Sequence, residues 1–110
     1  MTFKNTALLI LVLVSPKSFS ASYAQDSGKI TSLYVNASGT IAITLDSAFV
    51  NAKSGGQCPT ANGYGGNAIV DAAFKSALLA AKAAQQTVTV TVQGCEANGA
   101  WFKIIDVYVN

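Results

Sequence analysis

The first half of the chain contains two neighbouring segments with the patterns of β-strands. KITSLYVN (29–36) is rich in β-branched and aromatic residues, and TIAITLD (40–46) alternates between hydrophobic and polar residues, with the turn residues NASG between the two segments. Alternation places every second side chain on one face, which is typical of a half-buried strand. Gly39 suits the turn because glycine tolerates a positive φ. The pattern therefore predicts an antiparallel β-hairpin.

A helical period follows in FKSALLAAKAA (74–84). The apolar stripe has the spacing i, i+3, i+4 and i+7, and consists of Phe74, Ala77, Leu78 and Ala81. Asp71 precedes the stripe and is a favourable N-cap, whereas Lys75 and Lys82 fall largely outside it. We expect a helix that ends between Ala84 and Gln86, with Leu78 buried beneath the valines of the strand that follows.

Two further strands are predicted after this helix. TVTVTVQ (87–93) alternates strictly, and WFKIIDVYVN (101–110) ends the chain. In the last strand Ile105, Val107 and Val109 share one face, while Ile104 and Tyr108 share the other. A small barrel needs only one apolar face turned inward. We therefore expect Ile104 and Tyr108 to be covered by the helix or by a second copy in a homo-oligomer.

The remaining segments have weaker patterns. Residues 25–28 are interpreted as a short tail, and NAIV (67–70) as a short strand or the start of the helix. Residues 47–66 are rich in glycine and asparagine, and they predict a long surface loop. A loop of this length is usually functional or tied down, although a merely tolerated surface loop is the alternative.

The order strand, strand, short strand, helix, strand, strand predicts a mainly β (α+β) fold. It matches a small five-stranded OB-fold-like barrel with one helix between strands three and four. In this arrangement the helix closes one end of the barrel, and the next strand begins at once. The alternative is an open α+β sandwich with the helix on one face of a meander.

The N-terminus has the features of a secretory signal peptide. Lys4 precedes the apolar run ALLILVLV (7–14), and the small residues Ser22 and Ala24 occupy the −3 and −1 positions of a cleavage site. The run is far shorter than the roughly 20 apolar residues of a membrane span. We therefore expect residues 1–24 to be removed, and residues 25–110 to form a single secreted or periplasmic domain without a membrane span.

Cys58 and Cys95 are the two cysteines of the chain. In a small exported protein an even cysteine number favours a disulfide bond. A redox or metal-binding pair is the alternative, but the spacing is not CxxC and the chain has no histidine. We therefore predict a Cys58–Cys95 disulfide and no metal site.

Charge and composition exclude several functions. The chain has seven basic residues, all lysine, and five acidic ones. Because Lys4 and Lys17 leave with the signal peptide, the expected net charge of the mature domain is zero. A neutral domain without arginine has no electrostatic footprint for nucleic acid. With neither histidine nor a phosphate-binding glycine motif, we expect no enzymatic activity and no cofactor.

The aromatic residues near the predicted disulfide are the candidate ligand-binding groups. Tyr64 and Asn62 lie in the glycine-rich loop, while Asn98 and Trp101 lie in or beside the GCEANGA turn. A Cys58–Cys95 bond would draw these two loops together. Two aromatic rings and two amides suit a neutral ligand such as a sugar. The alternative is that Trp101, with Phe102, covers one end of the core.

The run from FKSALLAAKAAQQTVTVTVQGC to IIDVYVN resembles small exported bacterial proteins of unassigned function. In those proteins a similar alanine-rich helix is followed by a valine-rich strand, a Gly-Cys pair and a closing strand, and the resemblance covers most of residues 29–109. More remotely, the order of elements is similar to that of the B subunits of subtilase-cytotoxin and pertussis-like toxins. Those subunits are OB-folds that form pentameric rings and bind cell-surface glycans. None of their sugar-binding residues is matched by position here.

Two functional hypotheses follow from these observations. The favoured one is a non-catalytic secreted or periplasmic binding module that recognises a glycan or a protein, similar to a toxin B subunit. The alternative is a disulfide-tied inhibitor or envelope accessory protein that acts on a protein partner. An inhibitor should present the loop from Gln57 to Gly66 as a protrusion, whereas a glycan module should contain a shallow aromatic surface.

Overall fold

The computed structural model describes residues 22–68 and 71–110. Residues 1–21 of the predicted signal peptide, and Ile69 and Val70 of the predicted short strand, lie outside this part. The elements are β1 (Ala24–Val35), β2 (Ile41–Leu45), α1 (Val50–Ser54), β3 (Gly65–Asn67), α2 (Ala72–Ala84), β4 (Thr87–Glu96) and β5 (Trp101–Val109). The predicted mainly β fold, with a helix between the third and fourth strands, is confirmed.

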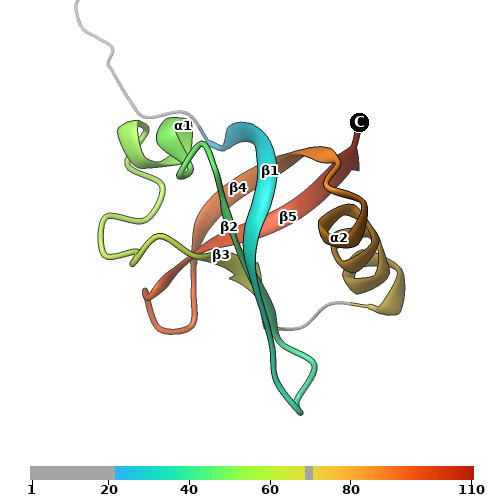
Figure 1. The fold of residues 1–110 in the computed structure, drawn as a ribbon. Coiled ribbons are helices and arrows are strands. Elements are labelled where there is room, and N and C mark those ends of the chain that lie inside the picture. Colours follow the sequence, from blue (N-terminus) through green and yellow to red (C-terminus); the bar gives the residue numbers. More distant parts are fainter. Residues whose placement is uncertain (1–21, 69–70) are drawn as a thin grey trace, which may run out of the picture.

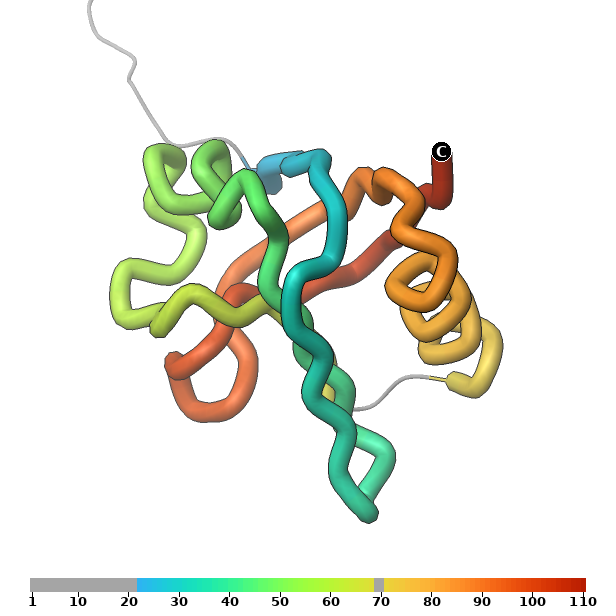
Figure 2. Tube along the Cα trace, viewed as in Figure 1, coloured from blue at the N-terminus to red at the C-terminus, as the bar shows by residue number. Residues whose placement is uncertain are grey.

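The five strands form one sheet in the order β1-β2-β3-β5-β4 (Figure 1). The sheet closes on itself because β1 pairs with β2 along one part of its length and with β4 along the other. The β3–β5 pair is parallel, and the other pairs are antiparallel. Helices α1 and α2 lie on opposite sides of the strands (Figure 1). The predicted hairpin is β1–β2, and its turn forms a projecting tip (Figure 2).

Helix α2 has the predicted start, end and buried face. The Asp71 carboxylate accepts hydrogen bonds from the backbone N–H groups of Ala73 and Phe74. Leu78 and Ala81 have no exposed surface and join the valines of β4 in the hydrophobic core. The helix packs mainly against β1 and β5. Lys75 and Lys82, expected to be solvated, are half-buried.

The predicted tail at residues 25–28 is wrong, because these residues belong to β1. They pair with β4 from Gln25 opposite Thr91 to Gly28 opposite Val88. The alternation of this segment was not recognised because one of its inward positions is a carboxylate rather than an apolar side chain. Asp26 faces the same side as Val90, its partner in the pairing, and only 2% of its surface is exposed.

The segment 47–66 is not an uninterrupted loop, since it contains α1 and the start of β3. Helix α1 begins after Phe49, which adopts a left-handed conformation and supplies no side-chain cap. The cap comes instead from Asp26, whose carboxylate accepts from the N–H groups of Asn51 (2.8 Å) and Ala52 (2.9 Å). The Phe49 ring is buried against Phe102, with 5.3 Å between centroids.

The expected faces of β5 are wrong at Ile104 and Ile105. Ile104 is fully buried in the core, whereas Ile105 is 38% exposed. The cause is a bulge: Thr91 pairs with Asp106, but the next residue, Val92, pairs with Ile104. Ile105 is therefore the extra residue, and the inward side of the strand changes from even to odd positions beyond it. Tyr108 stays outward and is 53% exposed.

Candidate functional site

The aromatic surface of the protein is centred on Tyr34 and Trp101. Their ring centroids lie 5.7 Å apart with an interplanar angle of 67°, an edge-to-face contact. Tyr34 lies near the end of β1, just before the β1–β2 turn, and Trp101 is the first residue of β5, just after the β4–β5 turn. The two rings therefore meet between two turns that are far apart in the sequence. We call these two residues the aromatic pair.

Small residues occupy the neighbouring strand positions in the row that begins at Tyr34. Tyr34 pairs with Ala42, Ala42 with Gly66, and Gly66 with Lys103. Ala42 has no exposed surface, although its neighbours Ile41 and Ile43 occupy the core face of the strand. A Cβ atom at Gly66 would lie 2.7 Å from Ala42 Cα, so only glycine fits there. The row ends at Lys103 of β5, and Trp101 lies two residues before Lys103 on the same strand.

The β1–β2 turn supports the tyrosine. Asn36 Oδ1 accepts hydrogen bonds from the backbone N–H groups of Ser38 (3.0 Å) and Thr40 (3.1 Å). Its Nδ2 lies 3.4 Å from the Tyr34 hydroxyl oxygen, to which it donates. As predicted, Gly39 takes a positive φ, of 91°. The turn thus places an amide group beside the aromatic pair.

On the other side of the pair, the β4–β5 turn is held by local and long-range bonds. Glu96 Oε2 accepts from the Ala68 N–H (3.0 Å), which ties the end of β4 to the segment after β3. The Gly99 N–H donates to the Glu96 carbonyl. Asn98 adopts a left-handed conformation with φ 57° and is exposed. Its amide is therefore accessible at the rim of the turn.

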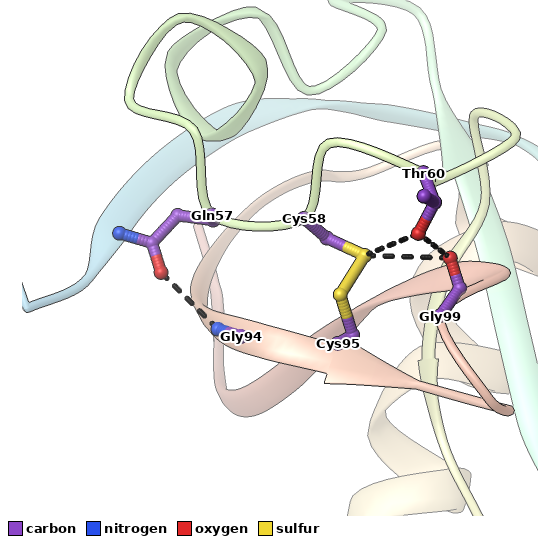
Figure 3. Close-up of a disulfide and its surroundings, with 6 residues drawn as sticks. All are labelled: Gln57, Cys58, Thr60, Gly94, Cys95 and Gly99. Carbon is purple, nitrogen blue, oxygen red and sulfur yellow. Dashed lines mark hydrogen bonds between the residues drawn. A yellow bond between two sulfur atoms is a disulfide. The ribbon is translucent and has the colours of Figure 1, made fainter.

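The predicted Cys58–Cys95 disulfide is present (Figure 3). Around it, Gln57 Oε1 accepts from the Gly94 N–H (3.1 Å), and the Thr60 hydroxyl donates to the Gly99 carbonyl (Figure 3). The Asn62 N–H continues the series by donating to the Ala100 carbonyl (2.8 Å). The bond does bring the glycine-rich loop against the β4–β5 turn, as expected, and the loop is bonded along its length rather than protruding.

The four predicted ligand-binding residues differ in where they lie relative to the aromatic pair. Trp101 belongs to the aromatic pair, but its ring contact is with Tyr34 rather than with Tyr64. Tyr64 is half-buried beside the start of β5, because its carbonyl accepts from the Phe102 N–H. Asn62 is exposed, and its side chain accepts from the Tyr64 N–H (3.2 Å). Asn98 lies on the turn that precedes Trp101.

Sequence reasoning missed Tyr34 and Asn36. Both lie in the segment predicted as a strand and turn, and neither is near the cysteines. The available signal was an aromatic residue in a predicted strand, next to a turn with an asparagine. The sequence did not show that Tyr34 would contact Trp101.

The surface offers aromatic faces, amides and backbone groups. Within residues 22–68 and 71–110, no group of three or more histidine, cysteine, aspartate or glutamate residues is arranged to hold a metal ion. In the same part of the chain, no helix is long and apolar enough to cross a membrane. Chemically, the aromatic pair suits ring contact with a ligand, and the amides suit hydrogen bonds to its hydroxyl groups.

Comparisons of the chain with protein-family models, with curated proteins and with solved structures found no match. The geometry of this surface is therefore the basis on which a function is inferred.

Proposed function

We propose that the domain is an OB-fold barrel that acts as a non-catalytic, glycan-binding module. The aromatic pair is the observation that carries this proposal. OB-folds bind oligonucleotides and oligosaccharides on the face of strands two and three, between the loops that join strands one to two and four to five. Tyr34 and Trp101 contact each other beside those two loops.

A neutral glycan fits this surface better than a nucleic acid does. Aromatic platforms of single-strand binding proteins stand in positively charged grooves that follow the phosphate backbone. This chain has no arginine, and the expected mature domain has as many acids as lysines. A pyranose ring presents an apolar C–H face to an aromatic ring, while its hydroxyl groups bond to amides such as those of Asn36 and Asn98.

The alternative, an inhibitor that inserts its disulfide-tied loop into a protein partner, receives less support. Such a loop should protrude, but the segment from Gln57 to Tyr64 is hydrogen-bonded to β4, to the β4–β5 turn and to β5. The disulfide does indicate a non-cytoplasmic compartment. We propose secretion or export to the periplasm after removal of residues 1–24.

Glycan-array binding of the exported, disulfide-bonded protein tests this function. We expect Trp101→Ala and Tyr34→Ala each to weaken binding about fivefold, since a stacked aromatic contact contributes on the order of 1 kcal/mol. Tyr108→Ala is the control, because Tyr108 is an exposed aromatic residue on the outer side of β5 that does not belong to the pair. Thermal unfolding of each variant separates lost contact from lost fold.

Three outcomes would contradict the proposal. If no glycan binds, the inhibitor or accessory function takes precedence. If binding persists in both Trp101→Ala and Tyr34→Ala, the ligand lies elsewhere. If Tyr108→Ala weakens binding as much as they do, the aromatic pair has no special role.

A further inference from the structure

A second concave surface lies on the disulfide side of the molecule, apart from the aromatic pair. It is a hollow of about 480 Å³ between the end of α1, the loop that carries Cys58, and Phe102 of β5. Neither Tyr34 nor Trp101 lines it. Its size falls within the range of small-molecule sites, which is about 300–1,000 Å³.

The walls of this hollow are held from both sides. The loop is bonded to the β4–β5 turn through the disulfide, through Thr60 and through Asn62. Helix α1 forms the opposite wall, and the buried carboxylate of Asp26 fixes its first turn. The hollow therefore exists before any ligand arrives, which lowers the conformational entropy that binding would cost.

The chemistry of the lining combines an apolar interior with a single positive charge. Ala61 and Pro59 supply apolar surface, Phe102 adds only a small apolar area because it is 2% exposed, and Asn62 supplies an amide. Lys53 is the charged residue of the lining, and no acid accompanies it among the described residues there. Its ammonium group has no carboxylate partner within residues 22–68 and 71–110. A ligand that enters would therefore meet one unpaired cation at the rim.

Backbone at the rim is accessible as well. Gly63 has a positive φ of 102°, and a Cβ atom placed on it would have nothing within 4 Å. A Cβ atom placed on Gly56, where φ is 69°, would likewise have nothing within 4 Å. A ligand can approach the main chain closely at both glycines, so their environment is a sensitive reporter of occupancy.

We propose that this hollow binds a small apolar carboxylate, with the apolar body against Ala61 and Pro59 and the carboxylate beside Lys53. Two sources share this chemistry: a free aromatic or short-chain acid, and the C-terminal residue of a polypeptide. This site is distinct from the aromatic pair, because neither Tyr34 nor Trp101 lines the hollow.

Titration followed by two-dimensional amide NMR tests the site. The probes are phenylacetate for a free acid and N-acetylphenylalanine for a polypeptide terminus, with uncharged phenylacetamide as the control ligand. We expect the amide signals of Gly56 and Gly63 to shift with a dissociation constant on the order of 1 mM for ligands of this size. Phenylacetamide should bind about fivefold more weakly, as expected for the loss of one exposed charge contact.

Lys53→Met keeps the aliphatic stem and removes the charge, so it should weaken carboxylate binding about fivefold as well. Lys29→Met is the matched control, since Lys29 is an exposed lysine on β1 that does not line the hollow. Binding of phenylacetate alone identifies a free acid, and binding of N-acetylphenylalanine alone identifies a polypeptide terminus. The proposal is overturned if neither acid shifts these signals, or if phenylacetamide or Lys53→Met leaves the affinity unchanged.

Discussion

Removal of the buried Asp26 carboxylate should lower the free energy of unfolding. Asp26 is 2% exposed, and its two oxygens accept from two backbone N–H groups in the first turn of α1. Hydrogen bonds to a charged group contribute about 1.5–3 kcal/mol each. The bond to Ala52 is buried and should be worth that amount, whereas the bond to Asn51 is partly exposed and should be worth less.

Part of this contribution is offset by the cost of burying the charge itself. We therefore expect Asp26→Ala to lower the free energy of unfolding by about 3 kcal/mol. For a domain of this size, that corresponds to a decrease in melting temperature of roughly 15 °C. Asp26→Asn keeps one acceptor oxygen and should lose about half as much.

Urea-induced unfolding of the disulfide-bonded protein measures these differences. Asp46→Ala is the control, because Asp46 is an exposed acid in the turn after β2 that accepts one bond, from the Lys29 N–H at 3.1 Å. We expect this control to lose less than about 1 kcal/mol. If Asp26→Ala and Asp46→Ala lose the same amount, Asp26 is not the cap on which α1 depends.

Three further predictions concern the core, the disulfide and assembly. Leu78→Ala should lower the free energy of unfolding by roughly 2–5 kcal/mol because the side chain is fully buried, whereas Lys82→Ala on the same helix should cost little. Equal losses for the two variants in chemical denaturation would mean that the buried face of the helix is misassigned. Thiol labelling of the exported protein without reductant should find no free cysteine, and Cys95→Ala should cost about 2–5 kcal/mol because the bond links residues 37 positions apart. We also expect self-association through the outward apolar residues of β5, chiefly Ile105 and Tyr108, and a monomer in light scattering at high micromolar concentration would contradict it.

Several features were determined by the sequence alone because their causes lie within a few residues of one another. The β1–β2 hairpin depends on alternation and on a glycine in its turn. Helix α2 depends on a stripe of small and apolar residues behind an N-cap at Asp71. The disulfide was predictable because two cysteines allow only one pairing. In each case the local chain already contains the physical reason for the structure.

The parts of the candidate surface that were missed depend on contacts between distant segments. The contact between Tyr34 and Trp101 joins the end of β1 to the start of β5, and these two distant segments come together only in the strand order β1-β2-β3-β5. The residues next to Tyr34 and Trp101 in the sequence do not indicate that the two rings will meet.

The same reason explains the errors at the start of β1 and in β5. Asp26 occupies an inward position that periodicity assigns to an apolar residue, because it caps a helix 25 residues further along the chain. The bulge at Ile105 reverses the inward side of β5, and the pairing with Thr91 and Val92 of β4 sets its position. Periodicity describes a strand by itself, whereas register and capping are decided where one segment meets another, and these contacts form only when the sheet closes.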